Sequence, residues 1–292
     1  MEKPVEGTSL IDYNLRIQQL LSSGASVAEV DAERKRLSSI KGGKLHEHIK
    51  SKHIFIYAMS EIPGDFPKYI SSNPFMPDAE KADEQMSADK FHRFDNLTAE
   101  KFTPQDKAIT YKIIANNKAF CEIIRAVAMD LIPEIRADYI HLIATELAED
   151  AAKLGKDISD TAILIDSQRD KGFTAFKTPC LLIFGGKPAF TAKGNGKGGR
   201  CTELALAATE GLSGLSDCAL LTYATDGLDG HPEAAGAVID NHTLSLLQNQ
   251  GIDPQASLNN GDSFTALKAA DAIIPGEYTG INVNDVVLLY IS

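Results

Sequence analysis

The sequence predicts an α/β protein of two domains, each built on a mainly parallel or mixed sheet, with a cleft between them. Its 292 residues exceed the roughly 150 that are typical of one domain. Strand-like and helix-like segments alternate along most of the chain, which is typical of α/β folds. A short polar stretch at residues 167–176 marks the junction, so we expect domains over residues 1–170 and 171–292.

The first domain opens with two predicted helices. Apolar residues recur at helical spacing over residues 10–23 and 27–40. Thr8 and Ser9 are both placed to cap the first helix and Gly24 to end it, and Ser26 is placed to cap the second. We therefore expect a helical pair before the first strand.

The rest of this domain alternates between apolar runs and helical runs. Residues 53–60 are short, apolar and bounded by polar residues, which predicts a buried strand. A long loop with prolines 63, 67, 74 and 77 follows, and the charged residues 79–106 are interpreted as a surface excursion. Further strands are expected at residues 111–115 and 139–143, and helices at 117–130 and 145–156.

The second domain alternates more regularly, around a glycine-rich loop at residues 194–199. Each predicted strand is a short apolar run, and each predicted helix has apolar residues at helical spacing. Strands are expected at residues 180–184, 189–193, 218–224 and 286–291, and helices at 203–212, 243–249 and 263–270.

Composition excludes several classes of function. A net charge of −11, from 29 basic and 40 acidic residues, argues against a general nucleic-acid binder. No apolar stretch approaches the roughly 20 residues that span a bilayer, and no secretory leader opens the sequence. The four cysteines include no C-x-x-C pair, which is typical of a reducing compartment. We expect a cytoplasmic protein with no membrane partner.

The glycine-rich loop combines small residues with cations. Glycines let backbone amides approach a ligand closely, and the start of the following helix adds free amides and a positive dipole end. Arg200 can bind a phosphate or carboxylate through two hydrogen bonds. The pattern indicates an anion cradle, although a hairpin-like loop with solubilising lysines would look the same. The cradle residues are Lys193, Gly194, Gly196, Lys197, Gly198 and Gly199.

Acidic and amide side chains form a second concentration. Asp226 and Asp229 lie in a T-D-G-L-D-G turn after a predicted strand, where α/β sheets bind ligands. Two such carboxylates can hold Mg²⁺ beside phosphate oxygens, or can merely hydrogen-bond their own backbone. Asn282 and Asp285 precede the last strand, where they can bind a ligand or simply close the sheet. The N-N-G-D-S segment at residues 259–263 is interpreted as a helix cap.

Taken in order, these motifs resemble the carboxy-terminal MOFRL-type domain of the glycerate 2-kinase family. The resemblance covers most of residues 179–292. Residues 1–170 resemble the later portion of the family's larger, Rossmann-like domain. The stretches that carry the resemblance are residues 194–200, 224–230, 234–237 and 279–285 in the second domain, and 38–44, 60–65, 74–78 and 114–119 in the first.

The chain departs from the family pattern in its loops and by an absence. Family members begin with a glycine-rich segment carrying a catalytic lysine and later show a G-G-G-S motif, and this sequence has neither. If the resemblance holds, we expect the chain to be a natural remnant, a separate subunit or a paralogue with an altered function. In the loops, Glu61 replaces an aspartate, Asn73 a glycine, Phe75 a threonine, Cys201 an asparagine and Gly261 an asparagine.

The resemblance implies ATP-dependent phosphorylation of D-glycerate at its 2-hydroxyl, with Mg²⁺. Arg200 and Asp226 are then the expected catalytic residues, and Asp226, Asp229 and Asp65 the expected metal ligands. The expected partners are glycerate and a nucleotide, with a homodimer or a separate chain supplying the missing segment. A non-catalytic relative that binds a small anion is an alternative. A hydroxypyruvate reductase is a weaker one, because the sequence lacks a G-x-G-x-x-G fingerprint.

Overall fold

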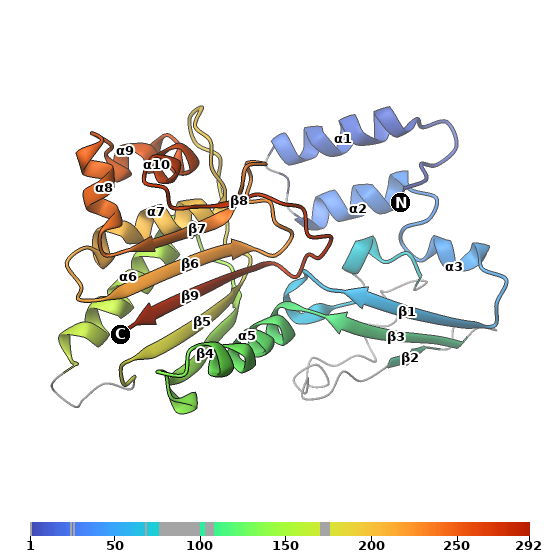
Figure 1. Cartoon of the computed structure of the whole chain (residues 1–292). Coiled ribbons are helices and arrows are strands. Elements are labelled where there is room, and N and C mark those ends of the chain that lie inside the picture. Colours follow the sequence, from blue (N-terminus) through green and yellow to red (C-terminus); the bar gives the residue numbers. More distant parts are fainter. Residues whose placement is uncertain are drawn as a thin grey trace. The chain divides into compact units, whose positions relative to one another are not determined.

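The computed structural model describes residues 2–23, 25, 27–67, 69–75, 100–102, 108–169 and 176–292. The expectations for Gly24, Ser26, Pro77 and Asp78, and most of the excursion at residues 79–106, lie outside these residues. The chain forms two compact units, Met1–Ile114 and Ala115–Ser292 (Figure 1). This boundary falls earlier than the predicted junction because the segment after Ile114 packs with the second sheet rather than the first.

The first unit begins with the two predicted helices, α1 (Leu10–Ser22) and α2 (Val27–Leu37). Ser9 caps α1 by accepting the Asp12 backbone N–H at 3.1 Å, and the Asp12 carboxylate accepts from Ser9 in return. The second helix ends before its predicted limit, because the Ser38 hydroxyl accepts the backbone amides of Ile40 and Lys41 and turns the chain. The helices pack through Tyr13, Ile17, Val30 and Leu37, and a short helix, α3 (Lys44–His48), follows.

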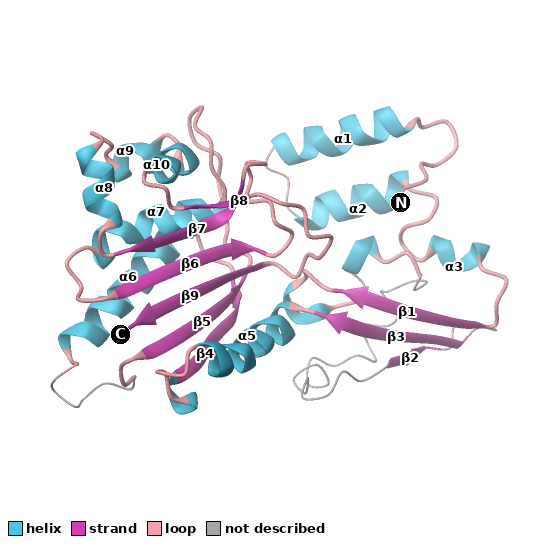
Figure 2. Cartoon of the chain, in the orientation of Figure 1, coloured by secondary structure: helices cyan, strands magenta, loops and turns pink. Residues whose placement is uncertain are grey.

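A three-stranded sheet completes the described part of this unit (Figure 2). Its order is β1 (His53–Met59), β3 (Ala108–Ala115) and β2 (Glu100–Phe102), with β2 antiparallel to β3. The strand predicted at residues 53–60 is confirmed as β1, but its predicted full burial is wrong, because Ile54 and Ile56 are buried whereas Phe55 and Tyr57 are exposed. Two short 3₁₀ turns, Pro63–Asp65 and Ile70–Ser72, occupy the proline-rich loop. The core of the unit consists of Ile54, Ile56, Ile70, Ile109 and Tyr111.

The second unit is built on a six-stranded mixed sheet, which confirms the α/β class. Only β4 and β5 pair in parallel, because the carboxy-terminal strand β9 inserts antiparallel between β5 and β6. The predicted strand at residues 189–193 is wrong, since Ala189 makes only an isolated bridge to Asp150. The strand order is β4 (Ile140–Leu147), β5 (Cys180–Gly186), β9 (Asp285–Ile291), β6 (Cys218–Ala224), β7 (Ala234–Asp240) and β8 (Ile273–Pro275).

Helices cover both faces of this sheet. Leu181 and Ile183 point to α5 (Asn117–Leu131), whereas the alternating Leu182 faces the opposite cluster, formed with the other helices. The other helices are α6 (Ala151–Ser167), α7 (Arg200–Leu212), α8 (Thr243–Asn249), α9 (Pro254–Asn259) and α10 (Ser263–Ala269). Across the described residues, we find no helix with the length and apolar content needed to cross a bilayer.

Candidate functional site

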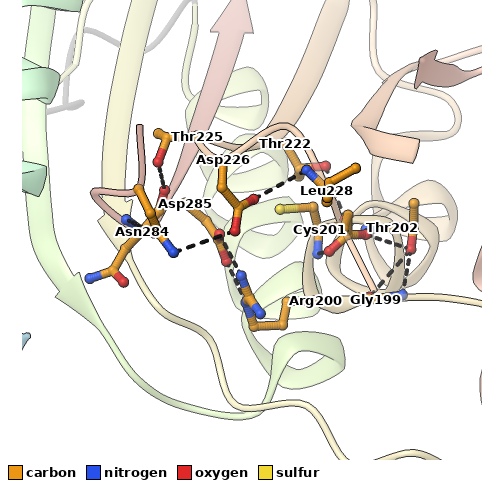
Figure 3. A network of polar contacts seen from close by, with 12 residues as sticks. Gly199, Arg200, Cys201, Thr202, Thr222, Thr225, Asp226, Leu228, Asn284 and Asp285 are labelled. Carbon is orange, nitrogen blue, oxygen red and sulfur yellow. Dashed lines mark hydrogen bonds and ion pairs between the residues drawn. The ribbon is translucent and has the colours of Figure 1, made fainter. Parts of the chain in front are cut away.

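Three of the motifs meet at one end of the second unit's sheet. Asp285, the first residue of β9, stands in register with Gly186 at the end of β5 and with Ala224 at the end of β6. The loop before α7 and the acidic turn after β6 reach the same place (Figure 3). The sequence therefore brings its basic loop, its acidic turn and its amide-rich loop together, as their order suggested.

Arg200 and Asp285 form a two-bonded ion pair at this end of the sheet. The Arg200 Nε atom lies 2.7 Å from Asp285 Oδ2, and Nη2 lies 2.8 Å from Oδ1. Burial raises the pKa of Asp285 above its ordinary value, although the guanidinium opposes that shift. The hydrogen bonds to Asp285 raise the pKa of Arg200. Within the described residues, the Nη1 group of Arg200 remains without a partner, so one side of the guanidinium is open.

Asp229 is fully buried and holds the start of α7. Its Oδ1 accepts the Cys201 backbone N–H at 2.9 Å, and its Oδ2 accepts both the Thr202 N–H and the Thr202 hydroxyl at 2.8 Å. The anion that the helix start attracts is thus a side chain of the chain itself. These bonds engage both oxygens of Asp229, which gives its expected role as a metal ligand no support. No group of three or more His, Cys, Asp or Glu among the described residues is arranged to hold a metal.

Asp226 is placed differently. It is half-buried, and its Oδ1 accepts the Leu228 backbone N–H at 3.1 Å, which is the local turn that the sequence left open as an alternative. Its Oδ2 lies 3.4 Å from the Nδ2 atom of Asn282, which comes from the loop before β9. Asp226 and Asn282 therefore stand side by side from two separate loops, and Asp226 keeps part of its carboxylate toward solvent.

The glycine-rich loop is bound by the segment before α10. The amides of Asn195 and Gly196 donate to Asn260, and the Lys197 amide donates to Asp262 Oδ1 at 2.9 Å. The N-N-G-D-S segment is therefore a clamp on this loop, and Asp262 does not cap α10 with its side chain. The predicted cradle is correspondingly smaller. Of the described loop residues, Gly194, Gly198 and Arg200 have backbone amides without a partner.

The glycines of this loop are needed for packing between loops. A Cβ at Gly196 would lie 2.6 Å from the Asp262 Cβ, and one at Gly199 would collide with the backbone of Asp229. A ligand can therefore approach the backbone closely at fewer of these glycines than predicted. The two lysines of the predicted cradle have different surroundings. The Lys193 Nζ atom lies 3.3 Å from Glu203 Oε1, whereas Lys197 is exposed.

Glu203 is a buried carboxylate in the first turn of α7. Its side chain is 1% exposed, and its Oε2 atom has no hydrogen-bond partner among the described residues. Burial raises the pKa of Glu203, and the nearby Lys193 opposes that shift. Glu203 was not among the expected site residues, because a Glu in a first helical turn is ordinarily exposed to solvent, where it interacts with the helix dipole.

The remaining expected residues lie in the first unit or in the loops that depart from the family pattern. Asp65, an expected metal ligand, adopts a left-handed φ of 54° in the first unit, and its charge helps burial to raise the pKa of Tyr111 to about 12. Asn73 has φ 50° and Gly261 has φ 65°. Glycine and asparagine both tolerate this region, so the family's glycine at residue 73 and asparagine at residue 261 have conservative replacements here.

Asn284 belongs to the motif at residues 279–285 but was not among the expected site residues. Asn284 has φ 70°, is 6% exposed, and its Oδ1 atom is buried without a partner among the described residues. Its backbone carbonyl accepts the Thr225 hydroxyl at 2.6 Å. A buried asparagine with a left-handed backbone and an unpartnered Oδ1 atom is a candidate member of a binding site. The only signal in the sequence was its place between Asn282 and Asp285.

The fold and this ordered set of loops define a two-unit α/β protein whose second unit is of the MOFRL type. The model of the MOFRL family matches residues 180–285, and that of a domain of unknown function (DUF4147) matches residues 1–102. The chain is 32% identical to the D-glycerate 2-kinase of Thermotoga maritima, over 98% of this chain and 68% of the relative. The chain belongs to the glycerate 2-kinase family.

Two further relatives carry different names. The crystal structure of glycerate kinase from Thermotoga maritima matches with a TM-score of 0.77 and 31% identity, covering 100% of this chain and 70% of that one. A relative from Agrobacterium vitis, 31% identical over 97% of this chain and 65% of the relative, carries a provisional name as a hydroxypyruvate reductase. Names within these relatives therefore point to two activities.

Proposed function

We propose that this chain phosphorylates D-glycerate at its 2-hydroxyl with ATP as the phosphoryl donor. The observation that carries the proposal is the match to a D-glycerate 2-kinase over 98% of the chain, which includes every loop at the end of the second sheet. The charged residues there suit the reaction, because phosphoryl transfer depends on positioning and on stabilising negative charge.

Arg200 supplies the positive charge in this proposal. Its Nη1 group and the unpartnered amides of Gly198 and Arg200 are hydrogen-bond donors for a phosphate or carboxylate. Asp285 keeps the guanidinium in one orientation through two bonds, so little reorganisation is needed when an anion arrives. Lys197, which is exposed on the same loop, adds a second charge for substrate capture.

Asp226 is the residue proposed to hold Mg²⁺. A half-buried carboxylate beside the Asn282 amide fits this ion, since Mg²⁺ commonly takes one or two carboxylates and completes its shell with water and substrate phosphates. When bound, the ion would neutralise phosphate charge. Asp65 lies in the first unit and stays a prediction of the sequence, and Asp229 is no longer included.

The test is a calorimetric titration of the purified chain with D-glycerate and with Mg·ATP, alongside a coupled assay for ADP. Arg200→Ala should weaken binding by about 1.5–3 kcal/mol, the scale of a hydrogen bond to a charged group. Arg136→Ala is the matched control, because Arg136 makes the same two-bonded pair with Asp138 on an exposed surface. Equal affinity in the wild type and Arg200→Ala would contradict the assigned role.

A non-catalytic relative that binds a small anion is the second candidate. The observation that favours it is that Asp285 already binds two groups of the Arg200 guanidinium and Asp229 binds two amides at the start of α7, so part of the positive charge is neutralised within the chain. Glycerate binding without ADP formation would identify this function. An absorbance assay with NADH or NADPH and hydroxypyruvate tests the reductase, and oxidation of the nicotinamide would favour it.

The location and assembly of the protein are also proposals. We place it in the cytoplasm, where the four buried free cysteines would remain reduced. A homodimer is the proposed assembly. Sedimentation of the purified chain distinguishes a monomer from a dimer.

A further inference from the structure

The Arg200–Asp285 pair depends on a strained turn. Asp285 follows Asn284, whose backbone is left-handed (φ 70°), a conformation that asparagine tolerates better than most residues with a side chain but adopts less readily than glycine. Because Asp285 is the first residue of β9, the turn sets where its carboxylate points. Something in the fold must therefore hold this turn.

The turn has three consecutive carbonyls, those of Val283, Asn284 and Asp285, and each accepts a hydrogen bond from Asn117 or Thr225. Asn117 Nδ2 donates to Val283 O at 2.8 Å and to Asp285 O at 2.9 Å, so one amide group joins the carbonyls on either side of Asn284. The carbonyl of Asn284 itself accepts the Thr225 hydroxyl and backbone N–H, at 2.6 and 3.2 Å. Asn117 is 7% exposed and lies 166 residues from Val283 in the sequence, so this contact is a tertiary one.

The fold also reserves space for the Asn117 side chain. A Cβ on Gly185 of β5 would coincide with Asn117 Oδ1 and would lie 2.7 Å from the Cys121 sulfur. The same Oδ1 lies 3.6 Å from the Cys121 Sγ, which is one turn further along α5. The amide group is thus fixed on its acceptor side by α5 and β5 and on its donor side by the turn before β9.

We propose that Asn117 is a positioning residue for the charged pair: by clamping the carbonyls on both sides of Asn284, it fixes Asp285 and through Asp285 the guanidinium of Arg200. It touches no substrate in this scheme. The inference rests on the proposed function only where it concerns ligand affinity, because the geometry of the pair exists without a ligand. Supporting side chains of this kind determine how well a site is preorganised.

The direct test is the ¹H–¹⁵N NMR signal of the Arg200 Nε–H group, assigned by its loss in Arg200→Lys. In the wild type this proton is bonded to Asp285 and should exchange slowly with solvent. Asn117→Ala should shift the signal and speed its exchange by roughly tenfold or more. Asn241→Ala is the matched control, since Asn241 Nδ2 also bridges two carbonyls, those of Leu215 and Ser216, before β6.

Two further variants keep the test decisive. Asn117→Ser retains one donor, and Gly185→Ala displaces the amide without removing it; each should move the Arg200 signal in the same direction as Asn117→Ala. An unchanged Arg200 signal in a folded Asn117 variant would overturn the inference, whatever the activity. Conversely, a wild type that neither binds D-glycerate nor forms ADP would overturn the proposed function and leave the NMR result standing.

Discussion

Removing the carboxylate of Asp229 should destabilise the second unit strongly. Asp229→Ala leaves the amides of Cys201 and Thr202 without their acceptor in a site with no solvent exposure, and leaves the Thr202 hydroxyl only its longer bond to the Gly199 carbonyl at 3.3 Å. An unsatisfied buried donor costs about 1–3 kcal/mol, and a lost helix cap alone costs about 0.5–2 kcal/mol. Allowing for partial relaxation, we expect a loss of about 3–5 kcal/mol in the free energy of unfolding.

The measurement is urea denaturation followed by circular dichroism, without added metal. Asp226→Asn is the matched control, because Asp226 lies in the same turn, is half-buried and accepts one short backbone bond; its loss should stay below about 1 kcal/mol. A metal ligand would behave in the opposite way, since removing a carboxylate that waits for a cation relieves repulsion. An Asp229→Ala protein as stable as the wild type would refute the reasoning that Asp229 caps α7.

Three further predictions follow from buried or strained positions. Burial raises the Glu203 pKa above 4.5, so ionising this carboxyl costs stability as the pH rises through its folded-state pKa. Glu203→Gln should therefore be more stable than the wild type at pH 7 and lose that advantage near pH 4; equal pH profiles in thermal melts would contradict this. Gly196→Ala should cost about 1–3 kcal/mol in urea denaturation, because its Cβ overlaps the Asn260–Asp262 segment, and a neutral result would mean the loops separate freely. Asn284→Ala should be about 1–2 kcal/mol less stable than Asn284→Gly, since glycine adopts φ 70° without a steric cost and alanine does not. Equal stability of the two variants would count against a strained turn.

Sequence patterns predicted the helices and strands whose formation depends on residues close by in the sequence. The Ser9 cap, the strand at residues 53–59 and the helix that starts after Asn116 all depend on neighbours within a few residues. The strand β7 was missed because only Val238 and Ile239 of its residues are β-branched and it begins with alanine and glycine. It is held by pairing with β6 and β8. The order of strands around β9 depends on the last residues of the chain and has no local signal.

The sequence predicted where the site lies, but not which of its residues bind one another. A run of free amides before α7 and a pair of carboxylates after β6 each resemble half of a ligand site. In the structure Asp229 binds those amides and Asp285 binds Arg200, so part of the predicted ligand chemistry is internal. Complementary motifs that satisfy each other cannot be distinguished from motifs that await a ligand until their contacts are known. Asn117 was missed for the same reason, because its partners are distant in the sequence.

The central claim is tested most directly by ³¹P NMR of the purified chain incubated with D-glycerate, ATP and Mg²⁺. Phosphorylation at the 2-hydroxyl should produce 2-phosphoglycerate together with ADP, and Arg200→Ala should abolish or strongly slow its appearance. ATP that persists unchanged beside D-glycerate in the presence of folded wild-type chain, or a phosphate appearing on the 3-hydroxyl instead, would contradict the account.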